Sequence, residues 1–223
     1  MIESPLATTI VFHLGPVDVT RPVVTTWGIM AVLAAGSYLL TRRLEIRPGR
    51  RQAAVEIVLD TIMKQIGDTM RTDARPYLPL LGTLFLFLVV ANLSSVVPGL
   101  EAPTAHIETA AALALIVFCS TQYYGVRRRG LLGYLKSFAD PTPVLAPLNV
   151  AAEITRTFSL SVRLFGNVMS GEFVIGIVIV LAGLFFPVPL MLLEMLTGLV
   201  QAYIFTILAS VFIGGAIGNI EKG

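Results

Sequence analysis

Long apolar runs separated by short charged segments are the feature that most limits how this chain can fold. A helix needs about 20 mostly apolar residues to cross a bilayer. Only 13% of the 223 residues are charged, whereas soluble domains carry about 25%. We therefore predict an all-α membrane protein, with one polytopic domain over residues 1–223. The predicted spans are 24–40, 79–97, 109–126, 147–184 and 187–219.

Two segments depart from a simple spanning pattern. Residues 50–71 place apolar side chains at helical spacing against a charged face, which indicates an amphipathic helix at the membrane interface. A helix in an aqueous loop is the alternative. The runs 147–184 and 187–219 are longer than a span requires, so we expect two strongly tilted helices. Pro187 and Pro189 separate them, because proline cannot continue a helix.

The distribution of charge predicts an orientation. Arginines and lysines gather in residues 42–51 and 127–136, whereas residues 101–108 are acidic. By the positive-inside rule, the two basic segments face the cytoplasm and the acidic one faces outward. The N-terminal segment 1–23 then lies outside and the C-terminus is cytoplasmic. The single cysteine, Cys119, has no disulfide partner in the chain.

Arg163 lies in the middle of a long apolar run. An arginine at membrane depth costs about 3 kcal/mol on insertion scales, so it is kept where it has a partner or a task. Polar residues before and after it recur every three or four positions, which places them on one face of a helix. This face must contact protein or water; a packing network between helices is the alternative. Its members are Asn149, Glu153, Arg156, Ser159, Arg163, Asn167 and Ser170.

A second polar stripe follows on the next predicted helix, at Glu194, Thr197, Gly198 and Gln201. Glu172 follows Arg163 by nine residues, which turns it to the opposite face of its helix at about 100° per residue. The spacing thus predicts two separate polar environments. Carboxylates divided from a fixed cation suggest two ion-access paths with a barrier between them, and structural packing of these carboxylates is the alternative.

Four segments carry a family resemblance. SLSVRLFGNVMSGE resembles the signature of subunit a of the F-type ATP synthase membrane sector. LVQAYIFTILASVFIG, PTAHIETAAALAL and FLFLVVANLSSVVPG extend the similarity over most of the chain from about residue 50. The sequence Arg156-Thr157-Phe158 is similar to that of the N-type branch of rotary ATPases, some of which are suspected sodium pumps.

The resemblance implies a stator ion channel that loads and unloads protons on a rotating c-ring. Arg163 then faces the ring, with the two long helices forming a hairpin against it. The implied outer half-channel consists of Glu172, Glu194, Asn167 and Gln201. The implied inner half-channel consists of Asn149, Glu153, Arg156 and Ser159. His106 and Glu108 are candidates for an outer vestibule, with a loop role for His106 as the alternative.

The implied partners are the c-ring, b-type peripheral stalk subunits, the rest of the ATP synthase and membrane lipid, in a bacterial plasma membrane. We expect no cofactor, metal or nucleic acid. The sequence has no G-x-x-x-x-G-K-[ST] motif, so nucleotide chemistry is expected in partner subunits rather than in this chain. Sodium transport by the same architecture is one alternative. A secondary transporter with Arg163 as an anion clamp is another, but no internal repeat supports it.

Overall fold

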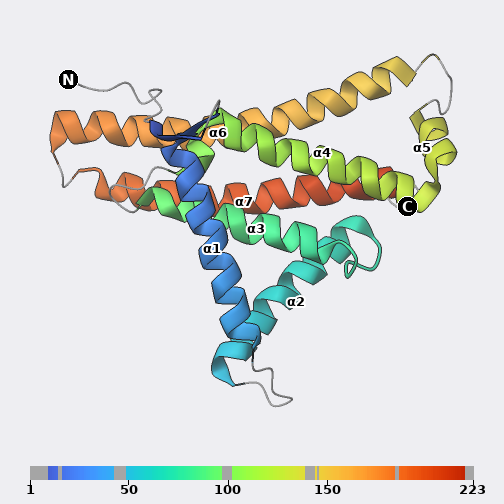
Figure 1. Cartoon of the computed structure of the whole chain (residues 1–223), viewed down its shortest axis with the longest axis horizontal. Coiled ribbons are helices and arrows are strands. Elements are labelled where there is room, and N and C mark those ends of the chain that lie inside the picture. Colours follow the sequence, from blue (N-terminus) through green and yellow to red (C-terminus); the bar gives the residue numbers. More distant parts are fainter. Residues whose placement is uncertain are drawn as a thin grey trace.

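The computed structural model describes residues 10–14, 17–42, 49–96, 102–138, 144, 146–183 and 186–218. Helices dominate these residues, and a short antiparallel pair of strands precedes them (Figure 1). The helices are α1 (Arg21–Thr41), α2 (Arg50–Met70), α3 (Leu78–Leu93), α4 (Ile107–Arg129), α5 (Leu131–Phe138), α6 (Ala146–Ala182) and α7 (Val188–Ile217). The 3₁₀ turns are η1 (Ser94–Val96) and η2 (Pro103–Ala105), and the strands are β1 (Ile10–Leu14) and β2 (Val17–Thr20).

The prediction of an all-α membrane protein is confirmed. Within the described residues, α1, α4, α6 and α7 are long and apolar enough to cross a membrane. The predicted span at 79–97 corresponds to α3, which has 16 residues and is shorter than the others. The strand pair was not predicted. Its sequences, IVFHL and VDVT, are rich in β-branched residues, which favour extended backbone.

The helices α3, α4, α6 and α7 form the bundle that holds the core. They run side by side in Figure 1, whereas α1 and α2 diverge from them. Helix α7 contributes a buried stripe at helical spacing, which packs against α3 and α4. The stripe consists of Ala202, Phe205, Ala209 and Ile213. Leu81 and Leu88 of α3 fill the space beside it.

Helix α2 matches the predicted amphipathic segment closely in its bounds. Its C-terminal part packs into the bundle through Ile66 and Met70, which are fully buried. Ile57 and Val58, nearer its N-terminal end, remain exposed. The apolar face of α2 is therefore only half used by this chain, and its placement at a membrane interface stays a prediction.

Helices α6 and α7 are 37 and 30 residues long. At 1.5 Å per residue they measure about 55 Å and about 45 Å. Both exceed a hydrocarbon core of about 30 Å, so each must tilt or extend beyond it. Gly183 ends α6 with φ at 81°, in the left-handed region that favours glycine, and Pro187 precedes α7. The predicted break between the two helices therefore lies at this turn.

Candidate functional site

Helix α6 has two faces of opposite character. Leu160, Leu164 and Val168 are buried toward the rest of the bundle. Arg163 lies on the other face, is exposed, and makes no hydrogen bond or ion pair with any residue that the structure describes. Ser159, Asn167 and Ser170 share that exposed face with it. Within the described chain this arginine is unpaired, and it lies among polar side chains with its charge facing outward from α6.

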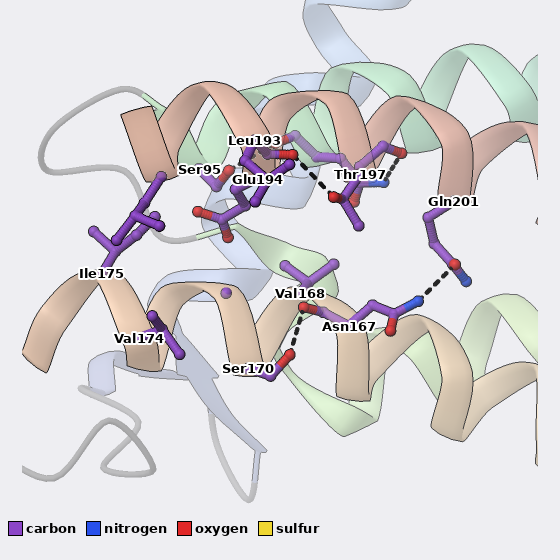
Figure 2. Close-up of a pocket in the computed structure, with 14 residues that line it drawn as sticks. Ser95, Asn167, Val168, Ser170, Val174, Ile175, Leu193, Glu194, Thr197 and Gln201 are labelled. Atoms are coloured by element: carbon purple, nitrogen blue, oxygen red, sulfur yellow. Dashed lines mark hydrogen bonds between the residues drawn. The ribbon is translucent and has the colours of Figure 1, made fainter. Parts of the chain in front are cut away.

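A hydrogen bond joins the two long helices one turn from Arg163. Asn167 Nδ2 donates to Gln201 Oε1 at 2.8 Å (Figure 2). Gln201 is buried, and its Nε2 has no hydrogen-bond partner among the described residues. The resemblance assigns both Asn167 and Gln201 to the outer half-channel, and this hydrogen bond brings the two side chains together. The amide pair therefore fixes the register of α6 against α7 beside the arginine.

Beyond this pair lies a cavity of about 270 Å³, which we call the Glu194 cavity. It opens between α6 and α7, with α3 and η1 closing one side, and Figure 2 shows the Glu194 carboxylate pointing into it. Glu194 Oε1 is buried and has no hydrogen-bond partner in the described chain. The other polar side chains that line the cavity are Asn92, Ser95, Asn167, Ser170, Thr197 and Gln201.

Glycines bring the helices close around Glu194. A Cβ on Gly171 of α6 would lie 2.8 Å from Glu194 Oε1, and a Cβ on Gly198 of α7 would lie 2.8 Å from the Cβ of Asn92. Neither position has room for a side chain without movement of its neighbour. The glycines thus let a carboxylate and an amide occupy a space that a larger residue would fill.

A buried polar bridge supports the same end of the bundle. Asn92 Nδ2 donates to the Gly198 carbonyl oxygen at 2.8 Å, and the Thr104 hydroxyl donates to Asn92 Oδ1 at 2.8 Å. Both side chains are almost fully buried. Because unpaired polar groups are costly at membrane depth, this bridge holds α3, η2 and α7 in one arrangement.

A second cavity, of about 580 Å³, lies at the other end of the pair, among α4, α5, α6 and α7; we call it the Glu153 cavity. Glu153 and Arg156 form an ion pair there at 3.8 Å. The Arg156 guanidinium also lies over the Phe212 ring, 5.9 Å from its centre. Asn149 lines the same cavity and donates to the Phe138 carbonyl oxygen at 2.8 Å.

Tyr134 of α5 forms part of the wall of the Glu153 cavity. Its hydroxyl donates to Gln122 Oε1 at 2.7 Å. Burial raises the pKa of the Tyr134 hydroxyl to about 12, and the nearby Glu153 carboxylate adds to the rise. The phenol therefore stays protonated through the physiological range and remains a donor to Gln122.

The two cavities collect most of the residues that the sequence singles out. The Glu194 cavity includes Asn167 and Gln201, and the Glu153 cavity includes Asn149 and Arg156. Other candidates line neither cavity: Glu172, Ser159, His106, Glu108 and Arg163. Glu172 is half-buried on a different face of α6 from Arg163, His106 precedes α4, and Glu108 is exposed in its first turn.

Asn92, Thr104 and the two glycines were not singled out as site residues by sequence reasoning. Asn92 carries a readable signal, since an amide inside the apolar run FLFLVVANL needs a partner. Thr104 has no such signal, because a threonine beside a proline is ordinary in a loop. Gly171 follows the first polar stripe and Gly198 belongs to the second, but only the packed helices show which side chains the two glycines approach.

Comparison with known proteins decides the family. The family described as ATP synthase A chain matches residues 23–214. The chain belongs to this family of ATP synthase a subunits. A Bradyrhizobium protein named ATP synthase subunit a 2 is 65% identical over 223 residues, the whole length of both chains. This confirms the resemblance and identifies a multi-pass membrane subunit that works with the rest of an ATP synthase.

More distant relatives show the same coverage. ATP synthase subunit a 1 of Chlorobaculum parvum is 46% identical over 215 residues, which is 96% of this chain and 95% of that one. ATP synthase subunit a 2 of Pelobacter propionicus is 47% identical over 221 residues, 99% of this chain and 96% of the relative. The similarity therefore includes both cavities and the helices that form them.

Proposed function

We propose that this chain is the stator ion channel of a rotary ATP synthase, with the Glu194 and Glu153 cavities as its two half-channels. Each cavity gives ions access from one side of the membrane. A c-ring moving past Arg163 carries the ions between them. The chain itself performs no nucleotide chemistry in this proposal; the partner subunits do.

The position of Arg163 between two separate polar cavities carries the proposal. Asn167, one turn along α6 in one direction, lines the Glu194 cavity. Arg156, about two turns in the other direction, lines the Glu153 cavity. Glu153 and Ser170 are 17 residues apart, or about 25 Å along the helix. That distance is comparable with a hydrocarbon thickness of about 30 Å, so the cavities suit access from opposite sides.

A proton in this scheme enters the Glu194 cavity and passes through it to a ring carboxylate. Rotation carries the neutral carboxyl group through lipid. When it returns, the Arg163 charge stabilises its ionised form, and the proton leaves through the Glu153 cavity. A potential of 100 mV supplies about 2.3 kcal/mol for each charge moved. Arg163 also opposes direct leakage, because a fixed cation repels a cation in the path.

The charge distribution supports an orientation for this scheme. Arg129 lines the Glu153 cavity and ends the basic run Arg127, Arg128 and Arg129. By the positive-inside rule this end is cytoplasmic, which puts the Glu194 cavity and the N-terminus outside and the C-terminus inside. We assign the protein to a bacterial plasma membrane, with the c-ring on the exposed face of Arg163 and b-type stalk subunits elsewhere on its surface.

Protons are the proposed ion rather than sodium. The Glu194 cavity offers one carboxylate, and its remaining polar lining consists of amides and hydroxyls. A lone carboxyl group with neutral neighbours can take up and release a proton without breaking an ion pair. The sodium alternative is distinguished by measuring both ions in the same reconstituted vesicles.

The test compares Arg163→Ala with Arg75→Ala, an exposed arginine outside the long helices. Both complexes are assembled, reconstituted and supplied with ATP, and proton uptake and labelled sodium uptake are recorded. We expect Arg163→Ala to abolish ATP-driven pumping with assembly largely intact, and Arg75→Ala to pump normally. Arg163→Lys should restore pumping only in part, because the ammonium lacks the planar multi-donor head. Near-normal pumping by Arg163→Ala would reject the proposal, and sodium uptake in place of proton uptake would reject the ion assignment.

A further inference from the structure

Helix α5 presents an apolar face that no described part of this chain covers. Leu131, Leu132 and Leu135 are 63%, 84% and 58% exposed. At about 100° per residue they fall within one arc of the helix, with exposed Lys136 at its edge. Tyr134, which is buried, lies outside this arc on another side of the helix. Such a division between leucines and one flanking cation is the pattern of a helix lying in a membrane interface.

The backbone turns α5 out of line with α4. Gly130 has φ at 75°, and its N–H donates to the Val126 carbonyl oxygen, which ends α4. In Figure 1, α5 lies across the end of α4 instead of extending it. The exposed leucines therefore stand at the point where the spanning helix α4 ends.

Positive charge surrounds the same point. Arg127, Arg128 and Lys136 are exposed, and none forms an ion pair within the described residues. Arg127 Nη1 donates to the Tyr123 hydroxyl at 3.2 Å, and the Tyr123 and Tyr124 rings lie 5.4 Å apart. Tyrosines and basic side chains at the end of a spanning helix mark the depth of lipid headgroups. Uncompensated cations beside inserted leucines complement an anionic headgroup layer.

The inner side of α5 is fixed to the bundle. Tyr134 packs so closely on α4 that a Cβ on Gly125 would lie 2.5 Å from its Cε2 atom. Asn149 of α6 donates to the carbonyl oxygen of Phe138, the last residue of α5. The helix thus has one side in the wall of the Glu153 cavity and the other toward the surroundings.

We propose that α5 is an interfacial helix that binds anionic phospholipid, with its leucines among the acyl chains and Arg128 and Lys136 at the headgroups. The lipid contact holds the outer side of the same helix whose inner side forms the cavity wall. This inference goes beyond the ion pathway and does not require the two cavities to be half-channels.

The experiment uses the assembled complex with Cys119→Ser and its other accessible cysteines replaced. A bimane fluorophore is attached at Leu132→Cys, and quenching by brominated phosphatidylglycerol is compared with quenching by brominated phosphatidylcholine at equal mole fraction. Leu181→Cys is the matched control, because Leu181 is 80% exposed near the other end of α6 and no Lys or Arg lies between residues 164 and 221.

We expect both lipids to quench the probe at position 132, with phosphatidylglycerol clearly stronger, and to quench equally at position 181. Arg128→Gln with Lys136→Gln should lower the preference for phosphatidylglycerol by about fivefold for each cation removed. Equal quenching by the two lipids at position 132 would overturn the anionic preference. Absence of quenching by either lipid would overturn the lipid contact altogether, and would indicate water or a partner subunit over α5.

Discussion

The two cavities differ in the polar and charged groups that surround the carboxylate in each. Within the described chain, Glu194 of the Glu194 cavity has no ion partner, one of its oxygens lacks any hydrogen bond, and the other polar lining residues are neutral. In the Glu153 cavity, Glu153 is paired with Arg156 at 3.8 Å, and Arg129 adds a second cation. The second cavity is also about twice as large, at about 580 Å³ against about 270 Å³.

This contrast suggests different tasks. A small cavity around one unpaired carboxyl group is suited to holding a proton at a defined point before transfer. A larger cavity, in which cations lie beside the carboxylate, has room for water and lacks a single strong binding point for a proton. In the proposed scheme, protons are therefore transferred one at a time to the ring on the Glu194 side, and they diffuse away after release on the Glu153 side.

Among the variants that separate the two cavities, the one that neutralises Glu194 should have the largest effect, a loss of proton flux. We expect Glu194→Gln to lower proton flux per assembled complex by about a hundredfold, the usual scale for loss of a proton-transferring group. Glu172→Gln should have a smaller effect, because Glu172 does not line the cavity. Flux in reconstituted vesicles measures both variants. If the two carboxylates still act in one relay, the double variant is less than additive; an unchanged flux in Glu194→Gln would remove this cavity from the pathway.

Adding a side chain at Gly198, on the α7 wall of the Glu194 cavity, should have the second-largest effect, a loss of stability. Gly198→Ala would place a Cβ 2.8 Å from the Cβ of Asn92 and disturb the hydrogen bond to the Gly198 carbonyl oxygen. Overpacking of this kind costs about 1–3 kcal/mol. Thermal stability of the purified complex should fall. Gly36→Ala is the control, since nothing lies within 4 Å of its Cβ position, and equal behaviour of the two variants would argue against a tight contact at Gly198.

Removing the cation of the Glu153 pair should have the smallest effect. Arg156 is 58% exposed although Glu153 is only 18% exposed, and an ion pair with one partner so open is worth at most about 1 kcal/mol. We expect Arg156→Gln to change flux about twofold and to leave assembly normal, because Arg129, Asn149 and Ser137 still line the cavity. Flux measured over a range of salt concentrations checks this. A loss of proton flux as large as that expected for Glu194→Gln would contradict the proposed difference between the tasks of the two cavities.

Much of the fold follows from the sequence because membranes impose strict rules. Apolar length predicts the spanning helices, and Pro187 with its neighbours predicts the turn between α6 and α7. The periodicity of the polar stripe places Arg163, Asn167 and Ser170 on one exposed face, as the structure has it. These are local properties of a helix, so they do not depend on what packs against it.

The remainder depends on contacts between distant segments. The bridge from Thr104 through Asn92 to Gly198 joins three elements that no sequence period connects. Helix α5 was read as part of a basic segment, because eight residues are too few for a periodic pattern to stand out. Glu172 and Glu194 are alike in the sequence, and only packing shows that one lines the cavity and the other does not.

In the proposed scheme the two cavities open to opposite sides of the membrane, and labelling of cysteines from each side separately distinguishes this from access on one side only. In the Cys119→Ser background, Thr197→Cys places a thiol in the Glu194 cavity and Ala152→Cys places one in the Glu153 cavity. Each is treated in intact and inverted vesicles with a small charged thiol reagent that cannot cross lipid. We expect Thr197→Cys to react only from outside and Ala152→Cys to react only from the cytoplasm. Reaction of both cysteines from the same side would contradict it.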